Sequence, residues 1–130
     1  MPKTQSSQTI AFIKRVRSIR AWEDANLPVT SGRMSVDLFI KIADACSQGE
    51  VLTIKSLVSS LNYSERGIRQ GLDRFIEAGF CEIIDLESDK RSKVIAGTQL
   101  GRKKFTEFRE VVNFSYDSTP ESTSEHDPVI

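Results

Sequence analysis

The sequence contains few of the residues from which most enzymes build an active site. Among its 130 residues there is one histidine, His126, which lies in an acidic segment near the end of the chain. The folded part therefore has no Ser-His-Asp set, no Cys-His pair and no histidine-rich metal site. We expect the protein not to be an enzyme and to bind neither a cofactor nor a metal.

Cysteine and long apolar runs are also scarce. Two cysteines, Cys46 and Cys81, are too few for a disulfide framework, which favours a reducing compartment. The longest apolar runs are a few residues long, so the sequence predicts no transmembrane helix. No apolar segment follows the first basic residues as it would in a secretory signal. We expect a cytoplasmic protein with no membrane partner.

The net charge is zero, because 18 Lys and Arg balance 18 Asp and Glu, but the charges are unevenly distributed. Residues 1–22 carry five basic side chains and no acid, whereas residues 23–52 carry two basic and five acidic ones. Residues 53–112 carry eleven basic and nine acidic side chains, and residues 113–130 carry four acids and no base. Because local fields guide association, this balance does not exclude an anionic partner.

The two ends of the chain differ in composition from its middle. Residues 1–8 are polar and show no apolar periodicity, and residues 113–130 are rich in Ser, Thr, Pro and acids. Such segments bury too little apolar area to offset the entropy of ordering them. We predict disorder in both, the second as an acidic tail. Between them we predict an amphipathic helix with its linker at 9–33 and one folded domain at 34–112.

Apolar residues at helical spacing predict two helices before residue 50. The first runs from about Thr9 to Glu23 and carries a basic polar face. Ser35 is placed to cap the second, and Gly49 is placed to end it. Cys46 falls on the apolar face of this second helix, so we expect it in the core.

The next segments predict a helix-turn-helix followed by a hairpin. Thr53 and Ser64 are placed to cap two helices joined by a tight turn, the second ending at Gly79. The apolar period then changes, which predicts strands at Phe80–Leu86 and at 93–96 with a charged loop at 87–92. A final helix follows. The predicted fold class is mainly α with a small β-hairpin wing (α+β): a winged helix-turn-helix, with an N-terminal amphipathic helix and a C-terminal helix.

Five short motifs follow one another along this domain. They are LTIKSL at Leu52–Leu57, LxxS at Leu61–Ser64, DRFxEAGF at Asp73–Phe80, DKRSKVI at Asp89–Ile95 and TxxGR at Thr98–Arg102. In order and spacing this set resembles the multiple-antibiotic-resistance regulator (MarR) family of winged helix-turn-helix proteins. The resemblance implies a DNA-binding transcription regulator that acts as a homodimer.

The chain departs from the family pattern at some positions. Gly67 and Gly71 stand inside the second helix of the helix-turn-helix, where the family usually has larger residues. Each glycine costs about 1 kcal/mol relative to alanine in a helix. Close helix packing explains Gly71, which flanks the apolar face. After Val112 we expect no long C-terminal helix of the kind that helps such proteins to dimerise.

The helix Ser64–Ala78 is predicted to enter the major groove of double-stranded DNA, where each base pair shows a distinct donor and acceptor pattern. Arg69 can bind guanine and Gln70 can pair with adenine. Residues at the start of each helix are placed to contact phosphates. The residues predicted to contact DNA from these two helices are Thr53, Lys55, Ser64, Glu65, Arg66, Arg69 and Gln70.

The wing at 87–93 is the second predicted contact. The resemblance implies that Arg91 enters the minor groove and that Asp89 orients it through an ion pair. Three further wing residues would contact the phosphate backbone: Lys90, Ser92 and Lys93.

The sequence therefore predicts a sequence-specific, double-stranded DNA-binding transcription regulator, with a small-molecule effector left unnamed. An alternative is a winged-helix protein-protein interaction module without specific DNA binding. The zero net charge and the nine acids within residues 53–112 keep this alternative open. The two differ in salt dependence, because contacts to phosphates release counterions and are strongly weakened by salt.

Overall fold

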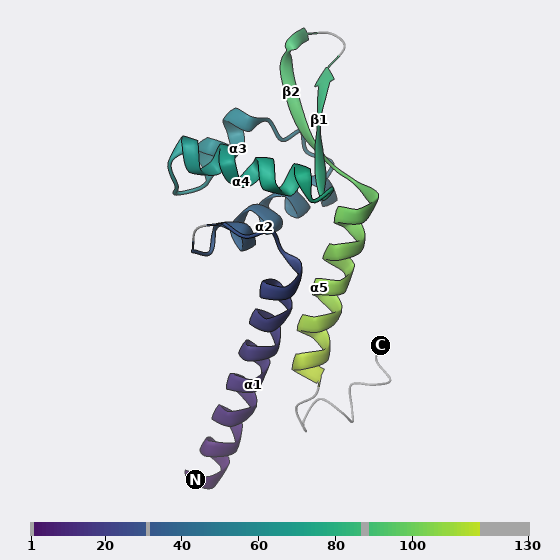
Figure 1. Ribbon diagram of the computed structural model, residues 1–130. Helices are drawn as coiled ribbons and strands as arrows, with labels where there is room; N and C mark the ends of the chain where they lie inside the picture. The colour runs from purple at the N-terminus through teal and green to yellow at the C-terminus, as the bar shows by residue number, and fades with distance from the viewer. Residues whose placement is uncertain (1, 31, 87–88, 118–130) are drawn as a thin grey trace. The chain divides into compact units, whose positions relative to one another are not determined.

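The computed structural model describes residues 2–30, 32–86 and 89–117, with side chains described at 6–30, 32–85 and 93–113. These residues form two compact units, one at Leu27–Phe105 and one that joins the chain up to Asn26 with the chain from Thr106. Along the described chain the elements are α1 (Pro2–Asn26), α2 (Met34–Ser47), α3 (Ile54–Ser60), α4 (Glu65–Glu77), β1 (Cys81–Leu86), β2 (Asp89–Gly97) and α5 (Gln99–Asp117) (Figure 1).

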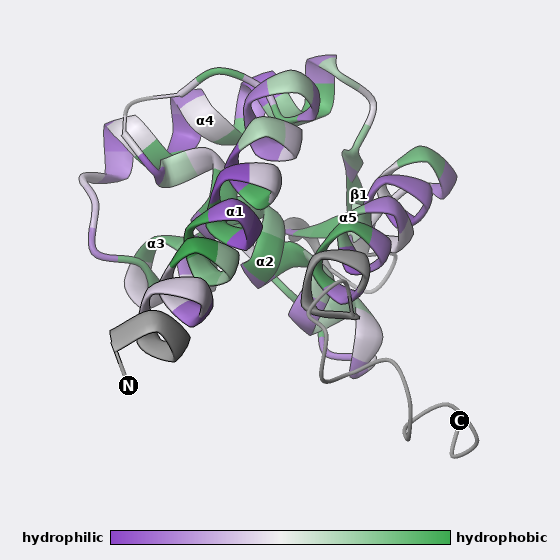
Figure 2. Ribbon diagram, turned by 90° about the horizontal axis from the view of Figure 1, so that it is seen from below, coloured by the Kyte–Doolittle hydropathy of each residue, from purple (hydrophilic) through white to green (hydrophobic). Residues whose placement is uncertain are grey.

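The unit at 27–105 has a core of aliphatic and aromatic side chains from α2, α3, α4 and the hairpin. Leu38, Leu57 and Ile68 are fully buried, one from each of the three helices. Phe80 lies between two other rings, with centroids 6.2 Å from Phe39 and 5.7 Å from Phe75. Figure 2 shows the apolar colour concentrated on α2. This core confirms the predicted winged helix-turn-helix and holds α4 against α2.

The ends of the helices follow from local hydrogen bonds. The predicted caps of α3 and α4 are confirmed, since Thr53 and Ser64 each accept a bond from a backbone N–H of the first turn. The predicted cap of α2 is wrong: the helix begins at Met34, after Arg33, and no side chain caps it. Gly49, with φ of 69°, ends α2 as predicted, because the left-handed conformation suits glycine.

The hairpin is antiparallel, and its second strand is longer than predicted. β2 begins at Asp89, so residues 89–92, which we expected in a loop, continue the strand in the backbone. Cys81 pairs with Gly97 and Asp85 pairs with Lys93, after which the register shifts at Leu86. The charged side chains at 89–92 favoured a loop in the sequence pattern, but strands pair through their backbones, so charge alone does not end a strand.

The TxxGR motif fixes the passage from the hairpin into α5. The Thr98 hydroxyl donates to the carbonyl of Gly79 and accepts from the backbone N–H of Gly101 in the first turn of α5. A Cβ at Gly101 would lie 2.1 Å from the carbonyl oxygen of Phe80, so only glycine fits there. The motif therefore joins the end of α4, the hairpin and α5 at one point.

The other unit contains α1 and the later turns of α5. The rings of Trp22 and Phe108 pack with centroids 5.3 Å apart. The prediction of disorder at 1–8 is wrong for residues 2–8, because α1 begins at Pro2. The predicted tail is wrong for residues 113–117, which continue α5, and its remainder at 118–130 lies outside the described residues. No helix in the described chain is long and apolar enough to cross a membrane.

The two cysteines differ in environment. Cys46, which we expected in the core, is exposed, so that prediction is wrong. It lies at the edge of the buried face of α2, where the neighbouring Ala45 is buried. Cys81 is buried on β1, and burial raises the pKa of its thiol to about 12.

Candidate nucleic-acid interface

Helix α4 has one buried and one exposed side. Ile68, Leu72 and Phe75 are buried, as their spacing predicted. With about 3.6 residues per turn, the opposite side of the helix carries Arg66 and Gln70 at its centre, and both are exposed. The predicted reading face is therefore free of the core, and α4 can present polar side chains to a partner without unfolding.

Glu65 and Arg69 lie on one flank of this face and form an ion pair. Nε of Arg69 donates to Oε2 of Glu65 at 2.9 Å, and both side chains are more than half exposed. An exposed pair one helical turn apart contributes about 0.3–0.5 kcal/mol, so a stronger partner can replace it. The pair uses Nε alone, which leaves the two terminal nitrogens of Arg69 directed away from this bond and able to bind a base.

Gly67 and Gly71 lie on the other flank of α4, where α2 approaches closely. A Cβ at Gly71 would lie 2.8 Å from Cδ1 of Leu38 and 3.0 Å from Sδ of Met34. A Cβ at Gly67 would lie 3.2 Å from Cε of Met34. Close packing thus explains Gly71 as predicted and also explains Gly67, for which the sequence suggested no packing partner.

The starts of α3 and α4 use their polar side chains partly for capping. Thr53 and Ser56 bond each other reciprocally, which occupies the Thr53 hydroxyl within the helix start. Ser64 Oγ accepts from the N–H of Gly67 at 3.0 Å, so its own proton can still be donated. Lys55 is exposed on α3. Of the predicted phosphate contacts on these helices, Ser64 and Lys55 therefore have a donor to offer.

The base of the hairpin is attached to the segment that precedes α3. The backbone N–H of Ile95 donates to the carbonyl of Leu52 at 2.7 Å, and Thr53 forms an antiparallel bridge with Val94. Lys93 follows directly toward the tip, where its Nζ lies 2.8 Å from Oδ1 of Asp85. The structure thus brings the predicted residues Thr53 and Lys93 close together, and the sequence did not reveal the ion pair with Asp85.

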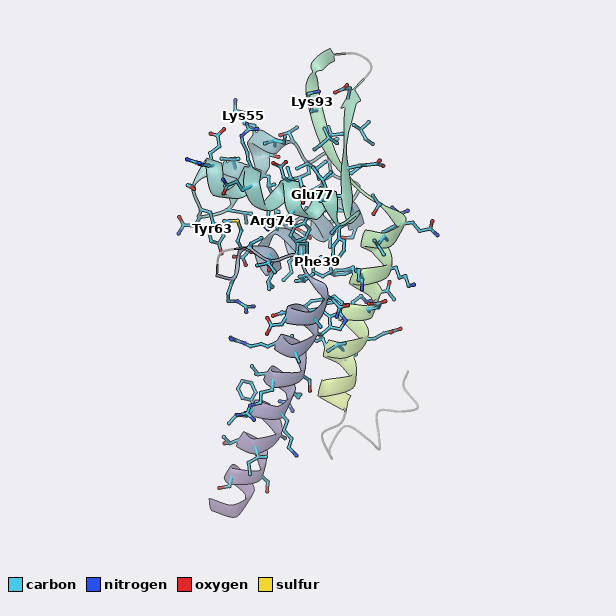
Figure 3. All side chains as sticks on the ribbon, in the orientation of Figure 1. Phe39, Lys55, Tyr63, Arg74, Glu77 and Lys93 are labelled. Carbon is cyan, nitrogen blue, oxygen red and sulfur yellow. The ribbon has the colours of Figure 1, made fainter. Side chains whose placement is uncertain are left out.

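The other four wing residues lie at the outer part of the hairpin. The backbone of Asp89, Lys90, Arg91 and Ser92 is in β2, and their side chains lie outside the described residues. The predicted ion pair between Asp89 and Arg91 stays a prediction. Figure 3 shows Lys55 and Lys93 on the side of the helix pair from which the hairpin projects.

A separate hollow of about 420 Å³ lies beside α2. Ile40, Lys41 and Asp44 of that helix line it together with Phe105. At its edge the hydroxyl of Tyr63 donates to the carboxylate of Asp37, a bond that raises the pKa of Tyr63. Sequence reasoning did not predict this hollow, because its walls come from positions far apart in the chain.

The fold is similar to those of several solved winged-helix proteins. The structure of the YusO protein from Bacillus subtilis aligns with a TM-score of 0.70 and 16% identity, over 99% of this chain and 86% of that one. Wild-type MarR from E. coli aligns with a TM-score of 0.59 and 15% identity, over 96% and 88%. The transcriptional repressor CouR, bound to a 23-mer DNA duplex, aligns with a TM-score of 0.59 and 13% identity, over 98% and 82%.

These similarities bear on the fold. MarR itself is among the solved structures of this fold, so the resemblance seen in the sequence motifs is confirmed for the winged helix-turn-helix architecture. No protein-family model matches the chain, and no curated protein matches it by sequence.

Proposed function

We propose that the protein is a transcription regulator that binds double-stranded DNA in a sequence-specific manner. The observation that carries this proposal is the free polar face of α4, on a helix whose opposite side is locked into the core. In a helix-turn-helix this is the side that enters the major groove. A neighbour of the same fold, CouR, is described as bound to a DNA duplex, which supports the proposal.

Within this proposal, α4 reads bases and the hairpin contacts the minor groove or the backbone. Arg69 and Gln70 are the proposed base contacts, because both are exposed and carry the donors that guanine and adenine accept. Lys55, Ser64 and Lys93 are the proposed phosphate contacts. The ion pair between Lys93 and Asp85 is exposed and therefore weak. On binding DNA, the ammonium group of Lys93 can leave Asp85 or donate to Asp85 and a phosphate together.

We further propose that the protein acts as a homodimer. In the unit that contains α1, the side chains of Ile10, Phe12 and Ile13 are 55%, 56% and 44% exposed. Three large apolar side chains exposed within one turn are unfavourable in water and are typical of a protein interface. A two-fold dimer would read two half-sites about one helical turn of DNA apart.

The proposed function is tested by selecting bound duplexes from a randomised DNA pool at physiological salt. We expect an enriched palindrome. Arg69→Ala is expected to weaken binding to that palindrome by about 1–3 kcal/mol and to relax the preference at one base pair, because a bidentate base contact is lost.

Two control variants sharpen this experiment. Lys93→Ala should weaken binding to all duplexes alike, whereas Arg109→Ala, on an exposed α5 residue outside the predicted set, should leave the selected sequence unchanged. If the folded protein enriches no sequence, the proposal fails and the interaction-module alternative gains support. In that case binding to the true partner should depend only weakly on salt.

A further inference from the structure

The hollow beside α2 combines apolar walls with carboxylates. Ile40, Leu61 and Phe105 line it together with Asp37 and Asp44, and all of these residues belong to the unit at 27–105. Ile40 is 46% exposed, on a helix whose other side is buried. A large apolar side chain that stands open in a hollow of about 420 Å³ is unfavourable in water and is typical of a docking surface.

The carboxylates of the hollow can accept more partners than they have. Asp37 accepts a hydrogen bond from the hydroxyl of Tyr63 (Figure 3), and Asp44 accepts one from the amide of Gln48 at 2.7 Å. Neither forms an ion pair within the described residues. A carboxylate has about four acceptor sites, so both can also bind a cation. Lys41 is the one basic side chain of the lining, which therefore keeps an excess of negative charge.

Helix α1 carries a row of exposed side chains with the opposite charge. Ile10, Ile13 and Arg17 stand three and four residues apart, so they lie on one side of the helix, and all three are exposed. We call this row the α1 stripe. Arg17 forms no ion pair within the described residues, and residues 9–22 carry four basic side chains and no acid. Anchors at these spacings are those by which an amphipathic helix binds an apolar groove.

The α1 stripe and the hollow match in spacing as well as in charge. On α2, Asp37 precedes Ile40 by three residues and Asp44 follows it by four. Each carboxylate is thus about one helical turn from Ile40. On α1, Arg17 is about one turn from Ile13. When Ile13 packs on Ile40, Arg17 therefore reaches a carboxylate whether the two helices run parallel or antiparallel.

The same charges argue against two other occupants of the hollow. Residues 118–130 of the chain carry three acids and no lysine or arginine. Like charges placed opposite each other weaken association, so the carboxylates of the hollow disfavour this segment. They disfavour a nucleic acid for the same reason. The basic α1 stripe is the segment whose charge complements them.

We propose that the α1 stripe of one chain docks in the hollow beside α2 of a second copy. In a two-fold dimer this contact occurs twice, because each chain supplies one stripe and one hollow. The inference rests on the homodimer of the proposed function and adds the surface that α1 meets. The contact removes Ile13 and Ile40 from water, and the ion pair of Arg17 fixes the register.

Cysteine cross-linking between mixed chains tests the contact directly. All chains carry Cys46→Ser, which removes the exposed native thiol and leaves the buried Cys81. Chains with Ile13→Cys are mixed with chains with Ile40→Cys, allowed to exchange and treated with a short bismaleimide. We expect a cross-linked dimer in the mixture, at a much higher yield than in either variant alone. Ser18→Cys, about 140° round the helix from Ile13, replaces Ile13→Cys in the control mixture and should give no such product.

Light scattering measures how much the contact contributes to the dimer. Ile40→Lys should raise the dimer dissociation constant about tenfold or more, because it places an unpaired charge against Ile13. Val51→Lys, at an exposed apolar position outside the hollow, is the matched control and should have no effect. Arg17→Glu should also weaken the dimer, and its difference from the wild type should shrink as salt is added, because salt screens the repulsion.

The outcomes separate this contact from the homodimer itself. A monomeric wild type overturns both. A dimer in light scattering that gives no cross-link between Ile13→Cys and Ile40→Cys overturns the contact and leaves the homodimer standing. If a single chain that carries both substitutions cross-links internally without forming a dimer, its own α1 is the occupant and the contact is overturned. The contact is also overturned if the thiol of Ile40→Cys reacts with maleimide only after residues 118–130 are deleted.

Discussion

Two side chains of the same type have opposite environments in this protein. Cys46 is exposed on α2, whereas Cys81 is buried on β1 with a pKa of about 12. Helical periodicity placed Cys46 on the apolar face, but it cannot tell the centre of that face from its edge. The thiolate is the reactive form, so burial protects Cys81 by keeping it protonated and by blocking access.

A thiol-reactive reagent tests this difference. At pH 8 in native conditions we expect Ellman's reagent to modify one thiol per chain rapidly, and Cys46→Ser to abolish that fast reaction. Cys81→Ser should leave it unchanged. Both thiols should react in denaturant. Fast modification of two thiols in the native wild type would contradict the buried position of Cys81.

At the scale of elements, glycines determine how closely α4 and α5 approach their neighbours. The three positions differ in what an added methyl group meets. At Gly101 it meets the backbone carbonyl of Phe80 at 2.1 Å and at Gly71 a buried leucine at 2.8 Å. At Gly67 it meets two side-chain ends, Oγ of Ser64 at 3.1 Å and Cε of Met34 at 3.2 Å. A backbone atom cannot move aside without displacing its element, whereas the end of a methionine side chain can.

The destabilisation caused by alanine at each of these positions should therefore follow the same order. In an open helix, Gly→Ala would stabilise by about 1 kcal/mol. We expect Gly101→Ala to destabilise by about 3 kcal/mol or more and Gly71→Ala by about 1–2 kcal/mol, as overpacking does, with Gly67→Ala close to neutral. Urea unfolding of the three variants measures the ranking. Equal stabilisation by all three would show that the helices do not approach as closely as described.

Residues close to one another in the sequence were sufficient to predict much of this architecture. The caps at Thr53 and Ser64 and the ends at Gly49 and Gly79 depend on residues within one turn, and all were predicted. Features that depend on pairing across the chain were not predictable. The ion pair of Lys93 requires the register of the hairpin.

The candidate site was predictable to a similar extent. The period of α4 showed which residues leave the core, so the exposed positions of Arg66, Arg69 and Gln70 follow from the sequence. The hollow beside α2 did not, because its walls come from residues far apart in the chain.

At the scale of the whole molecule, the exposed apolar side chains of α1 bear on assembly. Phe12 is 56% exposed, and the guanidinium of Arg15 lies 5.8 Å from the centroid of its ring. Placing a charge at this position would leave it buried and unpaired in an interface, which weakens association strongly. This weakening of association requires no structural change in the described residues outside α1.

We expect the wild-type protein to have twice the mass of one chain in light scattering at micromolar concentration. Phe12→Lys should raise the dimer dissociation constant at least tenfold and should also lower the affinity for a palindromic duplex. Ser18→Lys, at an exposed polar position about 120° round the same helix from Phe12, is the matched control and should have no effect on either. A monomeric wild type would rule out the proposed homodimer.

The backbone bond between Ile95 and Leu52 has a mechanical consequence. Because it joins the hairpin to the start of α3, the hairpin cannot hinge at its base without breaking a link to the helix pair. A force on the outer part of the hairpin is therefore transmitted to α3 and, through the turn that ends at the Ser64 cap, to α4. We expect the wing and α4 to meet a duplex as one stiff body, with the entropy of aligning them already lost in folding.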